Sequence, residues 1–230
     1  MQKLVTTLLF FTICFTVVAQ KETEEQTDDK YLTNVSITIN PQAINYTGSA
    51  YENDNFVLGN VYKKGKIIAN NVALRYNGLR DEFEVKENLS TPNTAAKVMM
   101  RNPDIYVKMT NKVFVYAAPK EGVIKPGYFL VLFEGESADL YKKVAKEFVE
   151  GMAATTSLTR AVPNSYKEKE SYYLVNRKSN TFQEFPSSRN AKFTVFKDKK
   201  KEIKTYSKEE NLNINRESSL IKLVEYYNSL

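Results

Sequence analysis

The stretch FVLGNVYKKGKIIANNVALRYNGLRDEFEVK, residues 56–86, decides the fold, because it predicts three short strands joined by two tight turns. Successive side chains of a strand point to opposite faces, so a half-buried sheet has hydrophobic residues at every second position. The first turn, at residues 63–66, contains the glycine that a tight hairpin needs. The residues expected on the inner face of the first two strands are Phe56, Leu58, Tyr62, Val72, Leu74 and Tyr76.

The third strand of this meander carries several charges beside its hydrophobic residues. Phe83 and Val85 alternate with Glu82, Glu84 and Lys86. Antiparallel sheets commonly have one face on the core and one in water. We therefore expect the charged face of this strand to be solvated.

Further strands and helices are predicted on both sides of residues 137–150, a segment whose hydrophobic spacing is ambiguous. Residues 137–150 fit a strand and a helix equally well, and the turn Glu134-Gly135-Glu136 favours a strand. Ser187 or Ser188, and then Asp198, are positioned to cap short helices. The remaining predicted elements are strands at 34–40, 105–109, 113–117, 127–134, 172–175 and 181–185, and a last helix at 216–228.

Together these elements predict an α+β protein. Its N-terminal unit is expected to be a mainly antiparallel β-sheet or partial barrel, followed by a β-hairpin and two or three short C-terminal helices. The expected divisions are a signal peptide at 1–19, a flexible leader at 20–30, the β unit at 31–150, a linker at 151–166 and a small hairpin-plus-helices unit at 167–230.

The N-terminus has the pattern of a secretory signal peptide. Lys3 is followed by an apolar run and by small residues ending at Ala19, after which cleavage is expected. The run is shorter than the roughly 20 apolar residues that span a bilayer, so no transmembrane span is predicted. The sequence therefore predicts an exported protein, periplasmic or secreted, whose only cysteine, Cys14, is lost with the signal peptide.

The composition excludes several classes of enzyme. The chain contains no histidine, and its single cysteine lies in the predicted signal peptide. The usual zinc sites, papain-like dyads and Ser-His-Asp triads need those residues. No metal or cofactor is predicted. The formal charge of +6 favours anionic envelope polymers or lipid headgroups over nucleic acid as a partner of an exported protein.

Oxygen-rich residues offer two kinds of candidate site. The run Tyr51-Glu52-Asn53-Asp54-Asn55 has calcium-type ligands, but it lacks the spacing of a helix-loop-helix calcium loop and is expected to be a turn. Carboxylates that a hydrolase might use are Asp81, Glu82, Glu84 and Glu134, all at or near predicted strand ends. Solvated charges on a sheet face explain the same four residues.

Tyrosines and lysines are the other candidate contacts. Tyr62, Tyr76, Tyr116 and Tyr128 lie in predicted strands and would line a groove for a glycan or an acyl chain, or else pack in the core. Lys199, Lys200 and Lys201 belong to the basic tract Lys192–Lys208. That tract is expected to be a solvated helix face or a contact for an anionic surface.

Several separated motifs resemble a family of uncharacterised exported proteins from Bacteroidota. They are GNVY at 59–62, LRYN at 74–77, DEFEVK at 81–86, GYFLVLFEG at 127–135 and the ending LIKLVEYYNSL at 220–230. The resemblance covers most of the mature chain. It implies a bacterial envelope location and implies no activity, cofactor or catalytic residue.

Three functions remain open from the sequence. The first is a non-catalytic envelope protein that binds a glycan, a lipid or another envelope protein. The second is a carrier of a lipid or other hydrophobic ligand in a half-open barrel. The third is a carboxylate-dependent hydrolase.

Overall fold

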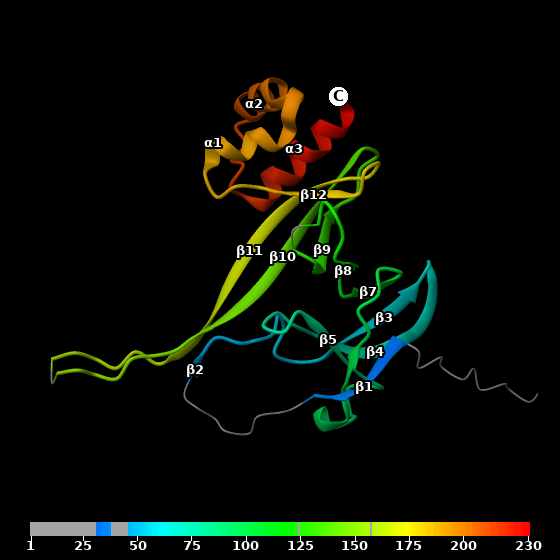
Figure 1. The fold of residues 1–230 in the computed structure, drawn as a ribbon, viewed down its shortest axis with the longest axis vertical. Helices are drawn as coiled ribbons and strands as arrows, with labels where there is room; N and C mark the ends of the chain where they lie inside the picture. Colours follow the sequence, from blue (N-terminus) through cyan, green and yellow to red (C-terminus); the bar gives the residue numbers. More distant parts are fainter. Residues whose placement is uncertain (1–30, 38–45, 124, 157) are drawn as a thin grey trace, which may run out of the picture.

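A computed structural model describes residues 31–37, 46–123, 125–156 and 158–230 (Figure 1). The predicted signal peptide and leader lie outside the described residues, as does Ile39 of the first predicted strand. Within the described ranges the chain is α+β, with a large sheet and helices gathered near the C-terminus. The predicted fold class is confirmed.

The elements follow one another in the order of their labels. The strands are β1 (Leu32–Ser36), β2 (Tyr46–Thr47), β3 (Val57–Lys63), β4 (Lys66–Asn77), β5 (Glu82–Lys86), β6 (Lys97–Met99), β7 (Ile105–Met109), β8 (Lys112–Ala117), β9 (Gly127–Phe133), β10 (Ala138–Val149), β11 (Asn164–Asn176) and β12 (Thr181–Glu184). The helices are α1 (Arg189–Lys192), α2 (Lys200–Glu209) and α3 (Glu217–Ser229), with 3₁₀ turns η2 (Asn93–Ala95) and η3 (Phe193–Lys199).

All the strands belong to one sheet, in the order β1-β6-β5-β4-β3-β7-β8-β9-β10-β11-β12. Neighbours on this path pair antiparallel, and β2 adds a short parallel pairing to β11. Since β1 and β12 end the path without pairing to each other, the sheet is open and does not close into a barrel. The partial barrel is therefore corrected to an open sheet.

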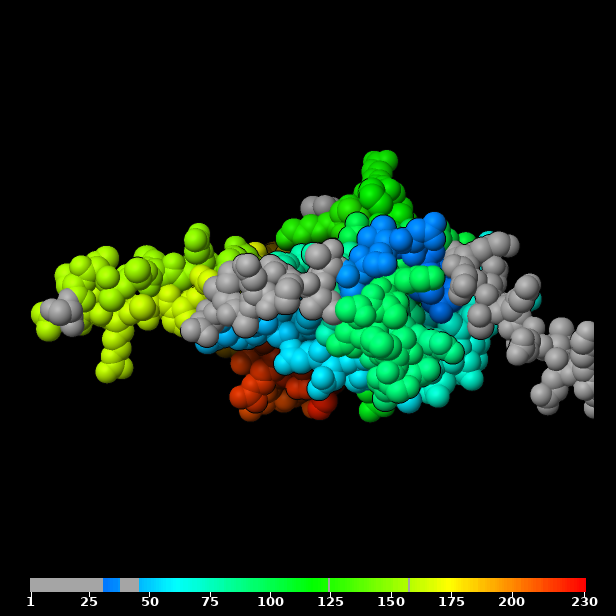
Figure 2. Space-filling view, turned by 90° about the horizontal axis from the view of Figure 1, so that it is seen from below, coloured from blue at the N-terminus to red at the C-terminus, as the bar shows by residue number. Residues whose placement is uncertain are grey.

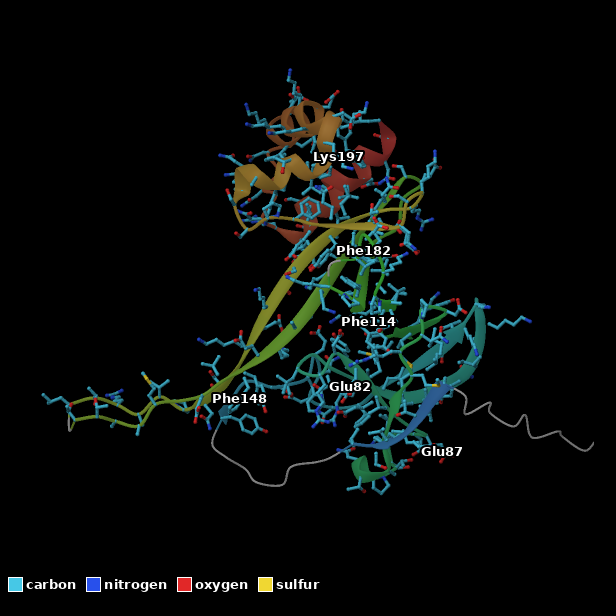
Figure 3. The ribbon with its side chains drawn as sticks, viewed as in Figure 1. Glu82, Glu87, Phe114, Phe148, Phe182 and Lys197 are labelled. Atoms are coloured by element: carbon cyan, nitrogen blue, oxygen red, sulfur yellow. The ribbon has the colours of Figure 1, made fainter. Side chains whose placement is uncertain are left out.

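The open sheet curls over its own inner face. Strands β4 and β8 are separated by β3 and β7 in the sheet, yet the rings of Tyr76 and Phe114 lie 5.4 Å apart. Phe83 of β5 likewise lies 5.0 Å from Tyr128 of β9. Phe114 is labelled in Figure 3, where the two parts of the sheet approach each other. The inner face of the curl is thus filled by aromatic side chains.

The predicted meander is present as β3, β4 and β5. Lys64 (φ 50°) and Gly65 (φ 81°) form its first turn with the left-handed backbone that a tight hairpin requires. The prediction for Leu58 is wrong, because this side chain is 40% exposed whereas Val61 is fully buried. Val57 and Val61 both pack in the main core cluster, so the odd-numbered positions of β3 face the core and Leu58 points to the opposite face.

The solvated face predicted for the meander is also wrong. Glu84 is only 1% exposed and Arg75 is buried beside it. The segment before β3 folds back over these residues: the Arg75 guanidinium lies 3.8 Å from the Tyr51 ring centroid and 4.3 Å from that of Phe56. The charges are buried because a non-local segment covers them.

The helices pack on one face of β9, β10 and β11 at the top of Figure 1. Leu140 and Leu174 project from the sheet into a cluster with Phe196, Leu223 and Val224. The last predicted helix is confirmed as α3.

The predicted caps of the first two helices are wrong. Ser188 precedes α1 but its side chain makes no cap hydrogen bond, and α2 begins after Lys199 rather than at Asp198. The helical path is broken at Lys197 (φ 50°) inside η3, and no side-chain cap hydrogen bond is formed at the beginning of α2.

Residues 138–149 form a strand, which resolves the ambiguity of that segment as predicted. Strand β10 pairs with β11 in unbroken register from Ala138↔Asn176 to Val149↔Ser165. Residues 140–142 pair with β9, and further along the hairpin the Lys146 amide donates a hydrogen bond to the Gly78 carbonyl and residues 164–165 pair with β2. Beyond these contacts the end of the hairpin projects from the body (Figure 2). We call residues 143–172 the arm and residues 150–163 its tip. The predicted linker, 151–166, lies at this tip, and a division into two units there stays a prediction.

Candidate functional site

Two of the four candidate tyrosines lie in the core. Tyr76 and Tyr128 are each 1% exposed, and burial raises the pKa of both hydroxyl groups above the ordinary value, with the charge of Asp81 as the second cause. The Tyr76 hydroxyl donates a hydrogen bond to Asp81 Oδ1 at 2.7 Å. Both side chains are therefore structural and present no ring face to a ligand.

The other two tyrosines do not share a groove. Tyr116 is half-buried and packs against Tyr128, with ring centroids 5.2 Å apart. Tyr62 stacks on Tyr106, its partner across the β3–β7 pairing, with centroids 4.7 Å apart and planes within 4°. Lys108 Nζ lies 5.2 Å from the Tyr62 ring. The structure thus splits the four tyrosines between the filled interior and a separate stack.

Asp81 joins parts of the sheet that are far apart in sequence. It sits in the β4–β5 turn with φ 53°, and its carboxylate accepts hydrogen bonds from Tyr76, from the Tyr128 amide (3.1 Å) and from Lys143 Nζ (2.8 Å). A Cβ at Gly127 would lie 1.8 Å from Asp81 Oδ2, so only glycine leaves room for this carboxylate. Asp81 is saturated by donors and acts as a structural link.

The remaining candidate carboxylates are likewise paired with cations. Glu84 Oε2 accepts two hydrogen bonds from Arg75, at 3.0 and 2.7 Å. Glu82 lies 3.6 Å from Arg80 and Glu134 lies 3.6 Å from Arg177. Burial raises the pKa of Glu82, the one shift among these four acids that resembles that of a catalytic acid. Structural ion pairing therefore accounts for Asp81, Glu84 and Glu134, whereas Glu82 Oε1 is buried without a hydrogen-bond partner among the described residues.

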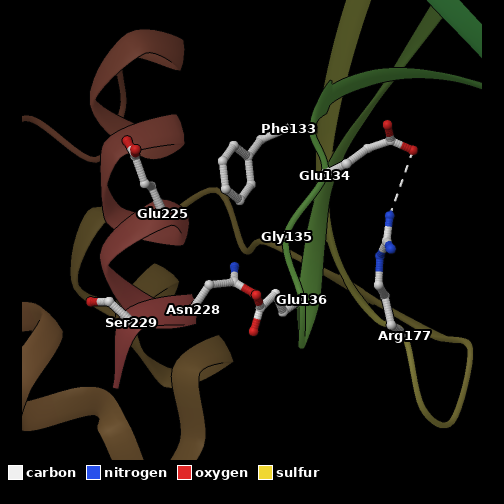
Figure 4. Close-up of a pocket in the computed structure, with 8 residues that line it drawn as sticks. All are labelled: Phe133, Glu134, Gly135, Glu136, Arg177, Glu225, Asn228 and Ser229. Carbon is white, nitrogen blue, oxygen red and sulfur yellow. Dashed lines mark ion pairs between the residues drawn. The ribbon is translucent and has the colours of Figure 1, made fainter.

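A shallow pocket lies between α3 and the turn that joins β9 to β10 (Figure 4). Its lining is Phe133, Glu134, Gly135, Glu136, Arg177, Glu225, Asn228 and Ser229. Asn228 Oδ1 accepts hydrogen bonds from the amides of Ser137 (2.9 Å) and Ala138 (3.0 Å), and its Nδ2 donates to the Ala138 carbonyl (2.9 Å). No lysine or histidine lines this pocket to activate Ser229, so its polar groups serve to dock α3.

The predicted lysines lie at the beginning of α2. Lys200 and Lys201 are exposed, and Lys199 is half-buried just before the helix. They follow Lys197, labelled in Figure 3, whose φ of 50° breaks the helical path. No ion pair involves Lys199, Lys200 or Lys201 in the described part of the chain, which leaves them solvated.

The Tyr51–Asn55 run is a cover for the sheet rather than a metal site. Tyr51 lies over Arg75, and the Asp54 carbonyl accepts a hydrogen bond from the same guanidinium at 3.0 Å. Among the residues that the structure describes, no group of three or more His, Cys, Asp or Glu side chains is placed to hold a metal ion.

Three large hydrophobic side chains that the sequence did not single out are exposed at the tip of the arm. Leu158 is 95%, Met152 69% and Val162 54% exposed, and the first two are the most exposed large hydrophobic residues of the described chain. The amides and carbonyls of Met152 and Val162 hydrogen-bond to each other at 2.9 and 2.8 Å, so the tip is a defined hairpin. The available signal was a run of small and hydrophobic residues between two strands of alternating charge, which was interpreted as a linker.

The remaining observations concern membranes and known proteins. In the described ranges, no helix is both long and apolar enough to cross a bilayer. Comparison of the chain with protein-family models, with curated proteins and with solved structures gave no match.

Proposed function

We propose that the protein is a non-catalytic, exported binding protein of a bacterial envelope, and that its partner binds at the tip of the arm. The signal-peptide pattern and the resemblance to exported Bacteroidota proteins support the location. The absence of histidine and the cation pairing of Asp81, Glu82, Glu84 and Glu134 argue against a hydrolase.

The single observation that carries the proposal is the exposure of Met152, Leu158 and Val162 at the end of a projecting hairpin. Large apolar side chains exposed together mark interaction sites in soluble proteins. Here they lie away from the hydrophobic core, so packing in the core does not explain why these positions are apolar. A contact with a partner would explain it.

The charges along the arm favour a protein partner. Along the hairpin before the tip, Lys142 pairs with Glu170 and with Glu217 of α3, and Lys146 pairs with Glu168, so these charges are neutralised within the protein. Within the tip between Gly151 and Pro163, Arg160 is the one charged residue. A nearly uncharged surface of this kind fits an apolar protein pocket better than it fits a polar glycan.

The filled inner face of the sheet argues against a carrier of a lipid or another hydrophobic ligand. A half-open barrel would hold a lipid on its inner face, and that face is packed with Tyr76, Phe83, Phe114 and Tyr128. A close-packed interior has no room for an acyl chain.

Site-specific photo-crosslinking tests the proposal. A photoreactive amino acid is placed at position 158, or at position 201 on α2 as an exposed control, and irradiated in envelopes of the native host. We expect a discrete adduct of protein mass from position 158, which disappears when Met152→Asp and Val162→Asp are added. Identical adducts from both positions, or adducts insensitive to those substitutions, would contradict the proposal.

A lipid partner gives a different result in the same experiment. In that case position 158 reacts with phospholipid, and the purified protein floats with vesicles of phosphatidylethanolamine and phosphatidylglycerol.

A further inference from the structure

A second pocket lies on the helical cap, between α1 and the end of α2. Its lining is Arg189, Asn190, Phe193, Lys204, Ser207, Lys208, Asn211 and Leu212. Three of these side chains are cations, two are amides, and none is an acid. Phe193 is buried and Leu212 half-buried, which gives the pocket an apolar floor beneath its charges.

The three cations have no partner in the described part of the chain. Elsewhere in the fold, cations such as Arg75, Lys142 and Lys143 pair with carboxylates. No ion pair or hydrogen bond is formed by the side chains of Arg189, Lys204 or Lys208 with the residues that the structure describes. Acids are present on α2 at Glu202 and Glu209, but they do not line the pocket.

The spacing of the two lysines costs stability. Lys204 and Lys208 are four residues apart on α2, so they share one face of the helix. Like charges at this spacing destabilise an isolated helix by roughly 0.2–0.5 kcal/mol. A sequence selected for stability alone would place an acid at one of the two positions.

Capping of α2 does not explain the lysines. Cations near a helix C-terminus often hydrogen-bond its free carbonyl groups. Here the carbonyls of Tyr206, Ser207 and Lys208 accept hydrogen bonds from backbone amides of residues 210, 212 and 211, at 3.0, 2.8 and 3.2 Å. The ammonium groups are therefore left for another acceptor.

We infer that this pocket binds a compact oxyanion, a phosphate or sulfate, either free or as the terminal group of a small soluble molecule. Arginine offers a planar pair of donors that fits such a group, and two lysines add charge-assisted hydrogen bonds. The amides of Asn190 and Asn211 add neutral donors. This site is separate from the tip of the arm and does not depend on the proposed function.

Isothermal titration of the purified mature protein with sodium phosphate and with sodium sulfate tests the inference, at constant ionic strength set with chloride. We expect saturable binding of at least one of the two ions. Affinity should fall at least tenfold in Arg189→Gln and in Lys204→Gln/Lys208→Gln. Lys222→Gln removes one charge from an exposed position of α3 outside the pocket, and it should bind like the wild type.

Three results would overturn the inference. One is a titration in which neither phosphate nor sulfate gives a saturable heat of binding. Another is an equal loss of affinity in Lys222→Gln, which would show that net charge alone is responsible. The third is binding only to vesicles that contain phosphatidylglycerol, lost in the pocket variants, which would assign the cations to a lipid surface. All the altered side chains are exposed or line an open pocket, so we expect the variants to fold like the wild type. Thermal unfolding curves that match the wild-type curve check this expectation.

Discussion

At the scale of single residues, Asp81 links three segments that are far apart in the sequence. Its carboxylate satisfies a buried hydroxyl, a backbone amide and Lys143 at once. Asp81→Ala should lower the free energy of unfolding by about 3 kcal/mol, because three donors lose their acceptor. Urea denaturation measures this loss.

Asp81→Asn is the matched control for that variant. Asparagine tolerates the positive φ and keeps an acceptor oxygen, so it should lose only about 1 kcal/mol, from the pair with Lys143. Equal losses for the two variants would show that the charge, and not the hydrogen-bond network, is what matters.

The buried pair of Arg75 and Glu84 gives a second prediction. Arg75→Met leaves a carboxylate buried without its cation and should cost about 3–5 kcal/mol of unfolding free energy. The double variant Arg75→Met/Glu84→Leu removes both charges and should be more stable than Arg75→Met alone. A double-mutant cycle by chemical denaturation measures the coupling. A double variant less stable than the single one would contradict the assignment of the pair.

The buried carboxyl group of Glu82 predicts that the free energy of unfolding depends on pH. Burial raises its pKa above 4.5 in the folded protein, so the folded state binds this proton more tightly than the unfolded state does. The stability that it contributes is complete below the unfolded-state pKa and is lost as pH rises through the folded-state pKa. Glu82→Gln cannot lose a proton, so its stability relative to the wild type should rise as pH increases from about 4 to 7.

The control for this measurement is Glu87→Gln. Glu87 is exposed one residue after β5 and lies near Glu82 in sequence, as labelled in Figure 3. The substitution removes one negative charge from the surface and therefore controls for the change in net charge. A flat profile for Glu82→Gln would show that the carboxyl group is solvated.

At the scale of elements, one amide side chain adds hydrogen bonds to the hydrophobic packing of α3 on the sheet. The Asn228 side-chain amide accepts hydrogen bonds from the backbone amides of Ser137 and Ala138 and donates one to the Ala138 carbonyl. Asn228→Ala should destabilise the protein by about 2 kcal/mol, since these groups lose their partners away from bulk water. The adjacent Ser229→Ala, which removes only a bond to the Tyr226 carbonyl within the helix, should change stability by less than about 0.5 kcal/mol.

Local patterns were sufficient to predict most of the elements. The alternation around Leu74 and Tyr76, the glycine at position 65 and the turn before Ser137 each correspond to an observed strand or turn. The helical spacing of Leu220, Leu223 and Val224 likewise corresponds to α3. These signals depend on neighbours within a few residues, which the sequence displays directly.

The errors came from contacts between distant segments. The alternation of Glu84 with Phe83 and Val85 could not show that Tyr51 and Phe56 cover the charged face. The alternation in β3 could not show whether the face of Leu58 or the face of Val57 and Val61 is turned to the core. The candidate tyrosines could not be divided between core and surface without knowing that β4 and β8 meet across the curl.

At the scale of the whole molecule, the curled sheet and the helical cap form a packed body from which the arm projects (Figures 1 and 2). Replacing residues 152–162 by a glycine-serine segment of the same length should leave the thermal midpoint within about 2 °C of the wild type, because the tip buries little hydrophobic surface. Calorimetry tests this expectation, and a large fall would show that the tip supports the fold.

The most direct test of the account compares partner capture by this tip-replaced protein and by the wild type, both immobilised, from envelope extracts of the native host. We expect a specific protein partner that the wild type retains and the folded, tip-replaced protein loses. Capture of the same partner in equal amount by both proteins would show that the tip of the arm is not the binding element.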